Sequence, residues 1–197
     1  MHTASIRKIV DHDGEAIVID PFLEDAEQRA SYRTLVDELA WEDESIRIFG
    51  KTVTVPRYVA WYGRARPAGT GSGMGHELHP LPPVLQQLKQ RVELASGKDF
   101  DSIQANYYRN GSDSTGWRSE SAASEQRADI AALNLGAPRL FSFAHASSKE
   151  HREIMLRGGS LLVMDGLSQR CWYRCMPRVL SIDEGRITLV FRLLGKG

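Results

Sequence analysis

The residues of this chain best suited to metal chemistry are six histidines and two cysteines. Cys171 and Cys175 are four positions apart, a spacing that would place both thiols on one face of a helix. The surrounding pattern predicts a strand instead, in which four residues span roughly 13 Å. Two sulfurs so far apart cannot share an ion, so we interpret both cysteines as packing residues.

Four of the histidines fall in segments that we expect to be loops. His76 and His79 stand in a Gly- and Pro-rich stretch, and His145 and His151 flank a polar turn. None of these spacings is by itself typical of a metal site. We therefore expect His145 and His151 at the surface, and a structural or solvated role for His76 and His79.

The elements that must position any site follow from hydrophobic periodicity. The pattern predicts a strand over 16–19, a helix over 24–40, β-structure over 46–62 and a helix over 84–96 that Gly97 closes. Between them, 63–83 is a long loop, a kind of segment that is often functional. Further strands are expected at 103–109, 130–135, 139–144, 153–156, 160–164, 171–176 and 186–193. Short strands at this spacing predict a sandwich or barrel with the helices packed outside it.

Length and composition limit the function classes. The chain has 197 residues and a formal net charge of zero. That length suits a single domain spanning 1–197, with a tail over about 1–15. Zero net charge argues against strong non-specific binding to nucleic acid, which needs a basic excess. We see neither a signal peptide nor a membrane span, and two cysteines fit a reducing compartment, so we expect a cytoplasmic protein.

Five stretches, in order along the chain, resemble the AlkB family, in particular its bacterial branch similar to the vertebrate DNA-repair homologues. They are PRYVAWYG (56–63), NYYRNGSDSTGW (106–117), LNLGAPRLF (133–141), GSLLVMDG (159–166) and RITLVFR (186–192). The resemblance implies an α+β, mainly β fold, the double-stranded β-helix or jelly roll. Fold alone does not set function, so the site is considered separately.

The family holds Fe(II) with two histidines and one carboxylate, and it leaves positions open for 2-oxoglutarate and oxygen. Its first ligands form a His-x-Asp motif after the Gly-Trp turn, where this chain has Arg118, Ser119 and Glu120. The second histidine follows a Trp-x pair, where this chain has Arg174. Arginine stays protonated and offers no lone pair to a metal. The resemblance therefore implies a substituted iron site, and we expect no Fe(II) cofactor.

Two interpretations of these substitutions stay open. Two arginines with one glutamate carry the same net charge, plus one, as Fe(II) with two neutral histidines and one aspartate. A guanidinium paired with Glu120 would then stand in the place of the metal. Alternatively, Arg118 and Arg174 extend into solvent from a decayed site.

The family binds 2-oxoglutarate with an Asn and a Tyr on one strand and with arginines on its closing strand. Asn106 and Tyr108 match the first pair, and Arg186 and Arg192 match the arginines, on one face of a strand. The family's intervening Asn and Thr are Thr188 and Val190 here, so the pocket is altered. Either these residues persist as structural contacts, or 2-oxoglutarate or a similar anion still binds.

The substrate side is changed as well. Repair enzymes of this family read a flipped base with aromatic side chains. Here 69–73 reads GTGSG where the family has aromatics, and Arg64 replaces an acidic residue. Trp61 and Tyr62 remain, and Arg57 and Arg64 add positive charge. These four residues either face nucleic acid or, for the aromatics, pack in the core.

These substitutions predict a pseudoenzyme that keeps the fold for a binding role. Its partner would be nucleic acid, a small anion or a protein, and the oligomeric state stays open. One alternative is an active Fe(II)/2-oxoglutarate dioxygenase that demethylates nucleic acid bases with a non-standard ligand set. Another is metal-free chemistry with Glu120 as base, which the neighbouring Arg118 disfavours.

Overall fold

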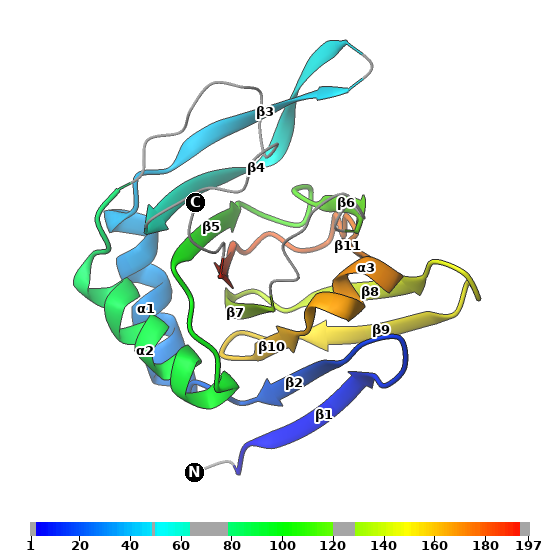
Figure 1. The fold of residues 1–197 in the computed structure, drawn as a ribbon. Helices are drawn as coiled ribbons and strands as arrows, with labels where there is room; N and C mark the ends of the chain where they lie inside the picture. Colours follow the sequence, from blue (N-terminus) through cyan, green and yellow to red (C-terminus); the bar gives the residue numbers. More distant parts are fainter. Residues whose placement is uncertain (1–2, 49, 64–78, 120–128, 194–197) are drawn as a thin grey trace.

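The computed structural model describes residues 3–48, 50–63, 79–119 and 129–193, and it has the architecture that the resemblance implies. Two antiparallel sheets face each other, and two helices cover the outer side of the larger sheet (Figure 1). The fifteen elements are β1 (Ser5–Val10), β2 (Ala16–Asp20), α1 (Asp25–Glu38), β3 (Glu42–Ile48), β4 (Lys51–Gly63), α2 (Pro83–Ser96), β5 (Ser102–Tyr108), β6 (Thr115–Arg118), β7 (Ile130–Gly136), β8 (Arg139–His145), β9 (His151–Leu156), β10 (Leu161–Met164), α3 (Gly166–Cys171), β11 (Trp172–Met176) and β12 (Arg186–Arg192).

The strand order is that of a double-stranded β-helix. The larger sheet runs β1-β2-β10-β7-β12-β5-β4-β3, and the smaller sheet runs β6-β11-β8-β9. Strands that follow one another in the chain, such as β5 and β6, or β10 and β11, lie in opposite sheets. The fold class predicted from the sequence is therefore confirmed. None of the helices in these ranges is long and apolar enough to span a membrane.

Alternation along the strands separates two cores. Odd-numbered residues of β7 and β12, such as Leu133 and Leu189, pack under the helices with Leu35 and Leu88. Even-numbered residues of the same strands, such as Ala132 and Val190, face the smaller sheet and pack with Phe143 and Trp172. Side chains of even number on β5, β7 and β12 therefore point into the space between the sheets, where the family has its site.

Three elements differ from the sequence-based expectation. Residues 5–10, expected to be part of a tail, form the edge strand β1 and pair with β2. Residues 115–118 form β6, which delivers Arg118 to the smaller sheet. The six-residue helix α3 occupies 166–171, so Cys171 ends a helix and only Cys175 lies on the expected strand. The loop expected at 63–83 lies mostly outside the described residues, which stop at 63 and resume at 79.

The turn between β5 and β6 is held by a buried carboxylate. Asp113, 2% exposed, accepts hydrogen bonds from the Arg109 backbone N–H (2.9 Å), Nε (2.8 Å) and Nη2 (2.9 Å). Burial acts to raise the pKa of Asp113, but these hydrogen bonds and the Arg109 charge outweigh it and leave the pKa below its ordinary value. The ionised carboxylate thus fixes the turn that precedes Arg118.

The Asp113→Asn substitution tests this role through the pH dependence of stability. A lowered carboxyl pKa in the folded state stabilises the protein above the unfolded pKa, and this contribution is lost as pH falls through the folded value. We expect Asp113→Asn to lower the free energy of unfolding by about 1.5–2 kcal/mol at pH 7. This value is at the low end for hydrogen bonds to charged groups, because Arg109 is half exposed. Urea unfolding from pH 7 to 3 should show a smaller loss of stability for the variant than for the wild type. Parallel pH profiles would contradict the assignment.

Candidate functional site

A small cavity lies between the two sheets, and both sheets line it. Its volume is about 30 Å³. The lining residues are Asn106, Tyr108, Thr115, Arg118, Ile130, Ala132, Asn134, Phe141, Leu156, Leu162, Met164, Arg174, Met176, Arg186, Thr188 and Val190. We call this space the central cavity. Most of the interior is filled by the chain's own side chains.

Arg118 on β6 and Arg174 on β11 lie side by side on adjacent strands of the smaller sheet. They are direct partners in the antiparallel pairing of β6 with β11, and both line the central cavity. Arg174 is 3% exposed and donates a hydrogen bond from Nη2 to Gln169 Oε1 at 3.3 Å, while Arg118 is half-buried. Both arginines therefore border the central cavity, and Arg174 is buried there. Glu120, the third position of this motif, lies outside the described residues.

These two side chains do not fit a metal ion. A guanidinium remains protonated in proteins and has no lone pair to donate, so neither arginine can be a ligand. The cavity between them also leaves little volume for an ion with a bound keto acid. No step of an oxidation can therefore be derived at Arg118 and Arg174.

Asn106, Tyr108 and Arg186 come together on the opposite wall of the cavity. Tyr108 pairs with Arg186 in the register of β5 with β12. The Tyr108 hydroxyl lies 2.9 Å from Thr115 Oγ1, which links the larger sheet to β6. The structure therefore joins three of the four residues expected to hold 2-oxoglutarate.

The protein itself accepts four hydrogen bonds from the Arg186 guanidinium, which has five N–H groups. Its Nη1 donates to the carbonyl oxygens of Ala137 (2.9 Å) and Leu156 (3.0 Å), its Nη2 to Asn134 Oδ1, and its Nε to Thr188 Oγ1 (3.3 Å). Burial lowers the pKa of Arg186 to about 9, so the group still carries its charge at neutral pH. A side chain with every nitrogen already donating has little left to offer an external carboxylate.

Arg192 does not join this group. It lies at the far end of β12 opposite Ser102, and it does not line the central cavity. Six residues of extended chain separate it from Arg186 by roughly 20 Å, although both point to the same side of the strand. The expected pairing of the two arginines around one anion is thus revised.

The residues expected to face nucleic acid lie inside the protein. Trp61 is 1% exposed and Tyr62 is 3% exposed, and the Tyr62 hydroxyl accepts a hydrogen bond from the Ala40 N–H at 3.0 Å. Arg57 is 8% exposed. This burial agrees with core packing of Trp61 and Tyr62, one of the two interpretations left open for the aromatics, and it places Arg57 inside the protein as well. Arg64, the fourth, lies outside the described residues.

Arg57 instead anchors the wall of the central cavity. Its Nε donates to Asn106 Oδ1 at 2.9 Å, and its Nη2 pairs with Glu44 Oε2 at 2.9 Å. Glu44 is 3% exposed, so this is a buried ion pair between neighbouring strands β3 and β4. The pair holds the side-chain oxygen of Asn106 in a fixed direction.

Removing one partner of this pair should be costly. We expect Glu44→Ala to destabilise the protein by about 3–5 kcal/mol, because it leaves the Arg57 charge buried without its counter-charge. The double variant Glu44→Leu/Arg57→Met should recover part of that loss, since it removes both charges and keeps apolar volume. Urea unfolding of the single and double variants measures both values. A double variant less stable than Glu44→Ala would contradict this explanation.

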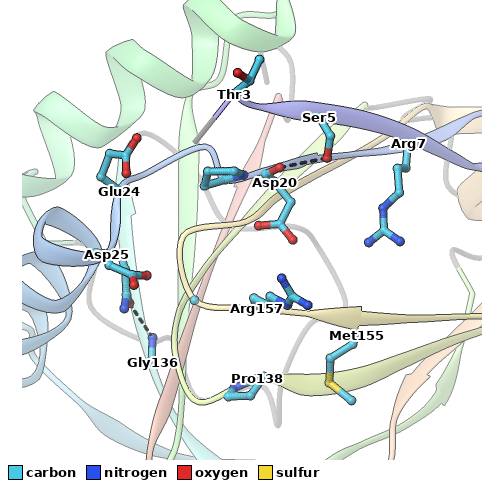
Figure 2. A pocket seen from close by; sticks show the side chains of 13 residues that line it. Thr3, Ser5, Arg7, Asp20, Glu24, Asp25, Gly136, Pro138, Met155 and Arg157 are labelled. Carbon is cyan, nitrogen blue, oxygen red and sulfur yellow. Dashed lines mark hydrogen bonds between the residues drawn. The ribbon is translucent and has the colours of Figure 1, made fainter. Parts of the chain in front are cut away.

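A wider cleft lies on the surface, away from the central cavity (Figure 2). Its volume is about 880 Å³, and it lies between the β1–β2 hairpin, the start of α1 and the turns that follow β7 and β9. Arg7, Arg157 and Asp20 point toward one another across it, and Glu24 and Asp25 line its other side. This mixture of charges favours no single class of ligand. The predicted site residues are absent from the lining of the cleft.

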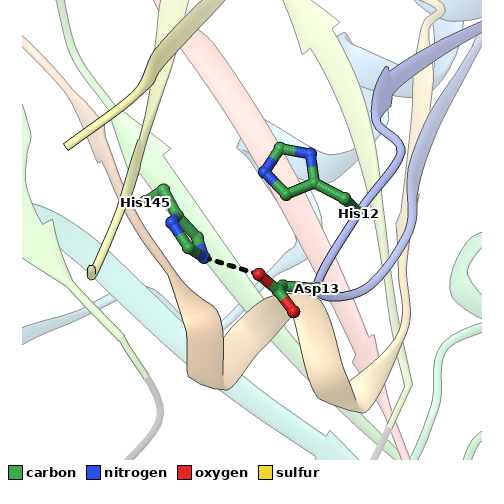
Figure 3. A group of neighbouring side chains, drawn as sticks. All are labelled: His12, Asp13 and His145. Atoms are coloured by element: carbon green, nitrogen blue, oxygen red, sulfur yellow. Dashed lines mark ion pairs between the residues drawn. The ribbon is translucent and has the colours of Figure 1, made fainter. Parts of the chain in front are cut away.

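Two histidines and an aspartate form a separate group, shown in Figure 3. His12 and Asp13 lie in the turn between β1 and β2, and His145 is the last residue of β8. One ligand atom from each of the three lies within 4.8 Å of the others. His145 Nε2 is 3.1 Å from Asp13 Oδ2. Two imidazoles and one carboxylate are a ligand set that Fe(II) and Zn²⁺ both accept.

This group is not among the sites predicted from the sequence. We expected His145 at the surface, but it is 7% exposed because it lies beside Trp172 on the inner side of the smaller sheet. His12 and Asp13 fell in the expected tail. The sequence signal that could have indicated them is the stretch DHDG at 11–14, because Asp-Gly is typical of a turn between two strands.

Comparisons with known proteins point to one family. Residues 15–192 match the family model of the 2OG-Fe(II) oxygenase superfamily. The chain is 32% identical to "Alpha-ketoglutarate-dependent dioxygenase alkB homolog 3" of Bos taurus, over 87% of this chain and 63% of that protein. It is 31% identical to "DNA oxidative demethylase ALKBH2" of Homo sapiens, over 75% of this chain and 60% of that protein. The chain thus spans about three fifths of the length of these relatives.

A solved structure supports the fold. The structure of OsALKBH1 superposes with a TM-score of 0.62 and covers 90% of this chain and 97% of that chain. The sequence identity is 14%, so this likeness concerns the fold alone.

The expectation that the chain takes no cofactor is wrong as it stands. The matching family is Fe(II)- and 2-oxoglutarate-dependent by its description, and the relatives are named as dioxygenases and demethylases. In addition, His12, Asp13 and His145 lie close enough to hold an ion. The expectation considered only the motif positions and took His145 for a surface residue, so it overlooked a ligand set that the fold assembles elsewhere.

Proposed function

The chain belongs to the AlkB-like family of 2OG-Fe(II) oxygenases, and from that premise we propose that it has lost oxidative demethylation in its central cavity and keeps the fold for a binding role. The observation that carries the proposal is the pair of arginines, Arg118 and Arg174, directly opposed on β6 and β11. They lie in a cavity of about 30 Å³. Guanidinium groups fill the space that an oxidation would need.

Charge explains how the fold tolerates this arrangement. Two arginines and Glu120 carry a net charge of plus one, the same as Fe(II) with two neutral histidines and one aspartate. The polar groups around the cavity, which in the family face a cation, still face positive charge. Buried charges of this kind persist only when hydrogen-bond acceptors surround them, as Gln169 does for Arg174.

The state of the 2-oxoglutarate residues supports the same conclusion. Arg186 donates four hydrogen bonds within the protein, and Asn106 accepts from Arg57. A keto acid would have to displace these contacts without the metal chelation that the family supplies. Small-anion binding in the central cavity is therefore the least supported of the binding roles.

Nucleic acid is the first partner to test, because relatives of this chain are named DNA oxidative demethylases. We propose that the chain binds DNA without removing base methyl groups. Fluorescence anisotropy with a methylated and an unmethylated oligonucleotide measures binding, and mass spectrometry with added Fe(II), ascorbate and 2-oxoglutarate measures methyl loss. We expect binding with an unchanged oligonucleotide mass. Catalytic loss of the methyl group would overturn the proposal. If the oligonucleotide does not bind, DNA is excluded as the partner, and a protein is the partner to test next.

An active dioxygenase with a non-standard ligand set is the second candidate. The observation in its favour is the His12, Asp13 and His145 group, which has the composition of the family's ligand set. These residues do not line the central cavity, so the ligand set and the residues expected to bind keto acid would not meet. If methyl loss is observed and His12→Ala abolishes it, this candidate replaces the first.

A further inference from the structure

We propose that His12, Asp13 and His145 form a binding site for one divalent transition-metal ion of the Zn²⁺ class, separate from the central cavity. The ion would join the β1–β2 turn to the end of β8 and so stabilise the edge of the jelly roll. This inference does not depend on the proposed function, because the three residues are distinct from Arg118, Arg174 and the other cavity residues.

The fold presents the β1–β2 turn in one defined position. Asp13 has φ 49°, in the left-handed region that aspartate tolerates better than most residues. Gly14 follows with φ 118°, and a Cβ there would lie 2.2 Å from the backbone nitrogen of Ser168 in α3. The indole Nε1 of Trp172 donates to the backbone oxygen of His12 at 3.1 Å. Contacts with α3 and β11 thus hold this turn close to the end of β8, where His145 lies.

The ligand distances suit a single ion. Two ligands about 2.0–2.2 Å from Zn²⁺ in a tetrahedral site are roughly 3.4 Å apart. The 3.1 Å between His145 Nε2 and Asp13 Oδ2 is close to this value, and a ligand atom of His12 lies within 4.8 Å of both. Glu150 Oε2 is 3.3 Å from His12 Nε2 and adds negative charge beside the group, although Glu150 is not one of its three ligands.

Both histidines have an acceptor for the ring nitrogen that would face away from the ion. His12 Nδ1 lies 3.2 Å from Asp11 Oδ1, which gives a carboxylate–histidine pair like those that orient zinc ligands. His145 Nδ1 lies 2.7 Å from Ser148 Oγ. Ser148 N–H also donates to this nitrogen at 3.1 Å, so metal binding at Nε2 requires the His145 ring proton to move to Nδ1 and this hydrogen bond to break.

The local charge also favours a dication. The carboxylates of Asp11, Asp13 and Glu150 surround the group, and Arg152 is the cation that pairs with Glu150 and Asp11. With neutral imidazoles, these four charged groups sum to minus two. His12 and Asp13 are exposed, so an ion can reach the site from solvent.

The test uses the full chain without a polyhistidine tag. Co²⁺ serves as a spectroscopic substitute for Zn²⁺ because its visible absorption reports a nitrogen- and oxygen-ligated site. We expect the wild type to bind one Co²⁺, to release it to Zn²⁺, and to melt at a higher temperature with Zn²⁺ present. His12→Ala should lower the affinity more than about 100-fold, beyond the 10–100-fold typical of outer partners, and Asp11→Asn should lower it within that range.

The matched control is His151→Ala, which changes a neighbouring exposed histidine on β9 that is not part of the group. It should bind Co²⁺ as the wild type does. Because His12 is exposed, His12→Ala should fold normally, so a loss of binding in that variant reports the site itself. Wild-type protein that binds no Co²⁺ or Zn²⁺ at micromolar concentration overturns the proposal, as does binding that His12→Ala leaves unchanged. Either result would identify the group as a set of ion pairs alone.

Discussion

The triple variant Arg118→His/Glu120→Asp/Arg174→His is expected to gain Fe(II) binding in the central cavity. Arg118 and Arg174 are paired residues on β6 and β11, so histidines at these positions would start from opposed backbone sites. Histidine is smaller than arginine, so the change also enlarges a cavity of about 30 Å³. Imidazole supplies the lone pair that a guanidinium lacks. An anaerobic Fe(II) titration with and without 2-oxoglutarate measures the gain.

Metal binding by His12, Asp13 and His145 must not contribute to this titration. The titration is therefore carried out in a His12→Ala background, in which the group formed with Asp13 and His145 has lost one ligand. The control is the double variant Arg118→His/Arg174→His, which lacks the aspartate and should bind Fe(II) more weakly. A triple variant that is folded by circular dichroism but binds no Fe(II) would show that the motif register, or the geometry of the cavity, differs from that proposed here.

The fold could be predicted from the sequence because motif order and strand alternation agree. The strands β5, β7, β10 and β12 lie close to their expected ranges, since each is mostly buried on both faces, and β7, β10 and β12 contain apolar runs. The edge strand β1 could not be predicted in this way, because its sequence SIRKIV is mostly exposed and half of its residues are polar. Such an edge strand forms through pairing with β2, which local composition does not report.

The candidate site could be predicted only in part. The alternation of side chains along a strand shows on which face of the sheet a residue lies, but not how deeply it is buried or which groups it contacts. It places Arg186 and Arg192 on one face, but only the bond distances show that Arg186 already donates four hydrogen bonds to protein acceptors. Likewise the sequence alone indicates a surface charge at Arg57, and only the structure shows that Glu44 of β3 is its ion-pair partner. The His12 and His145 pair depends on a contact between segments far apart in the chain. Each missed feature depends on a partner from another strand.

Replacing Arg186 should produce the largest loss of stability of any single change at the central cavity. We expect Arg186→Met to cost about 3–5 kcal/mol, because it removes a buried charged donor and leaves the Ala137 and Leu156 carbonyl oxygens without that partner. These oxygens lie in the turn after β7 and at the end of β9, so Arg186 joins three strands from both sheets. Urea unfolding measures the loss. Arg157→Met is the matched control, an exposed arginine next to Leu156, and should change stability by less than about 0.5 kcal/mol.

The same variant separates a structural role of Arg186 from a role in anion binding. A residue kept to clamp 2-oxoglutarate would need free donors, so its loss would abolish thermal stabilisation by the keto acid while costing little in the absence of ligand. A residue kept to join the sheets gives the opposite result, because its hydrogen bonds are present without any ligand. The structure favours the second result. Thermal melts of wild type and Arg186→Met with and without 2-oxoglutarate therefore decide whether the family's anion site has become part of the core.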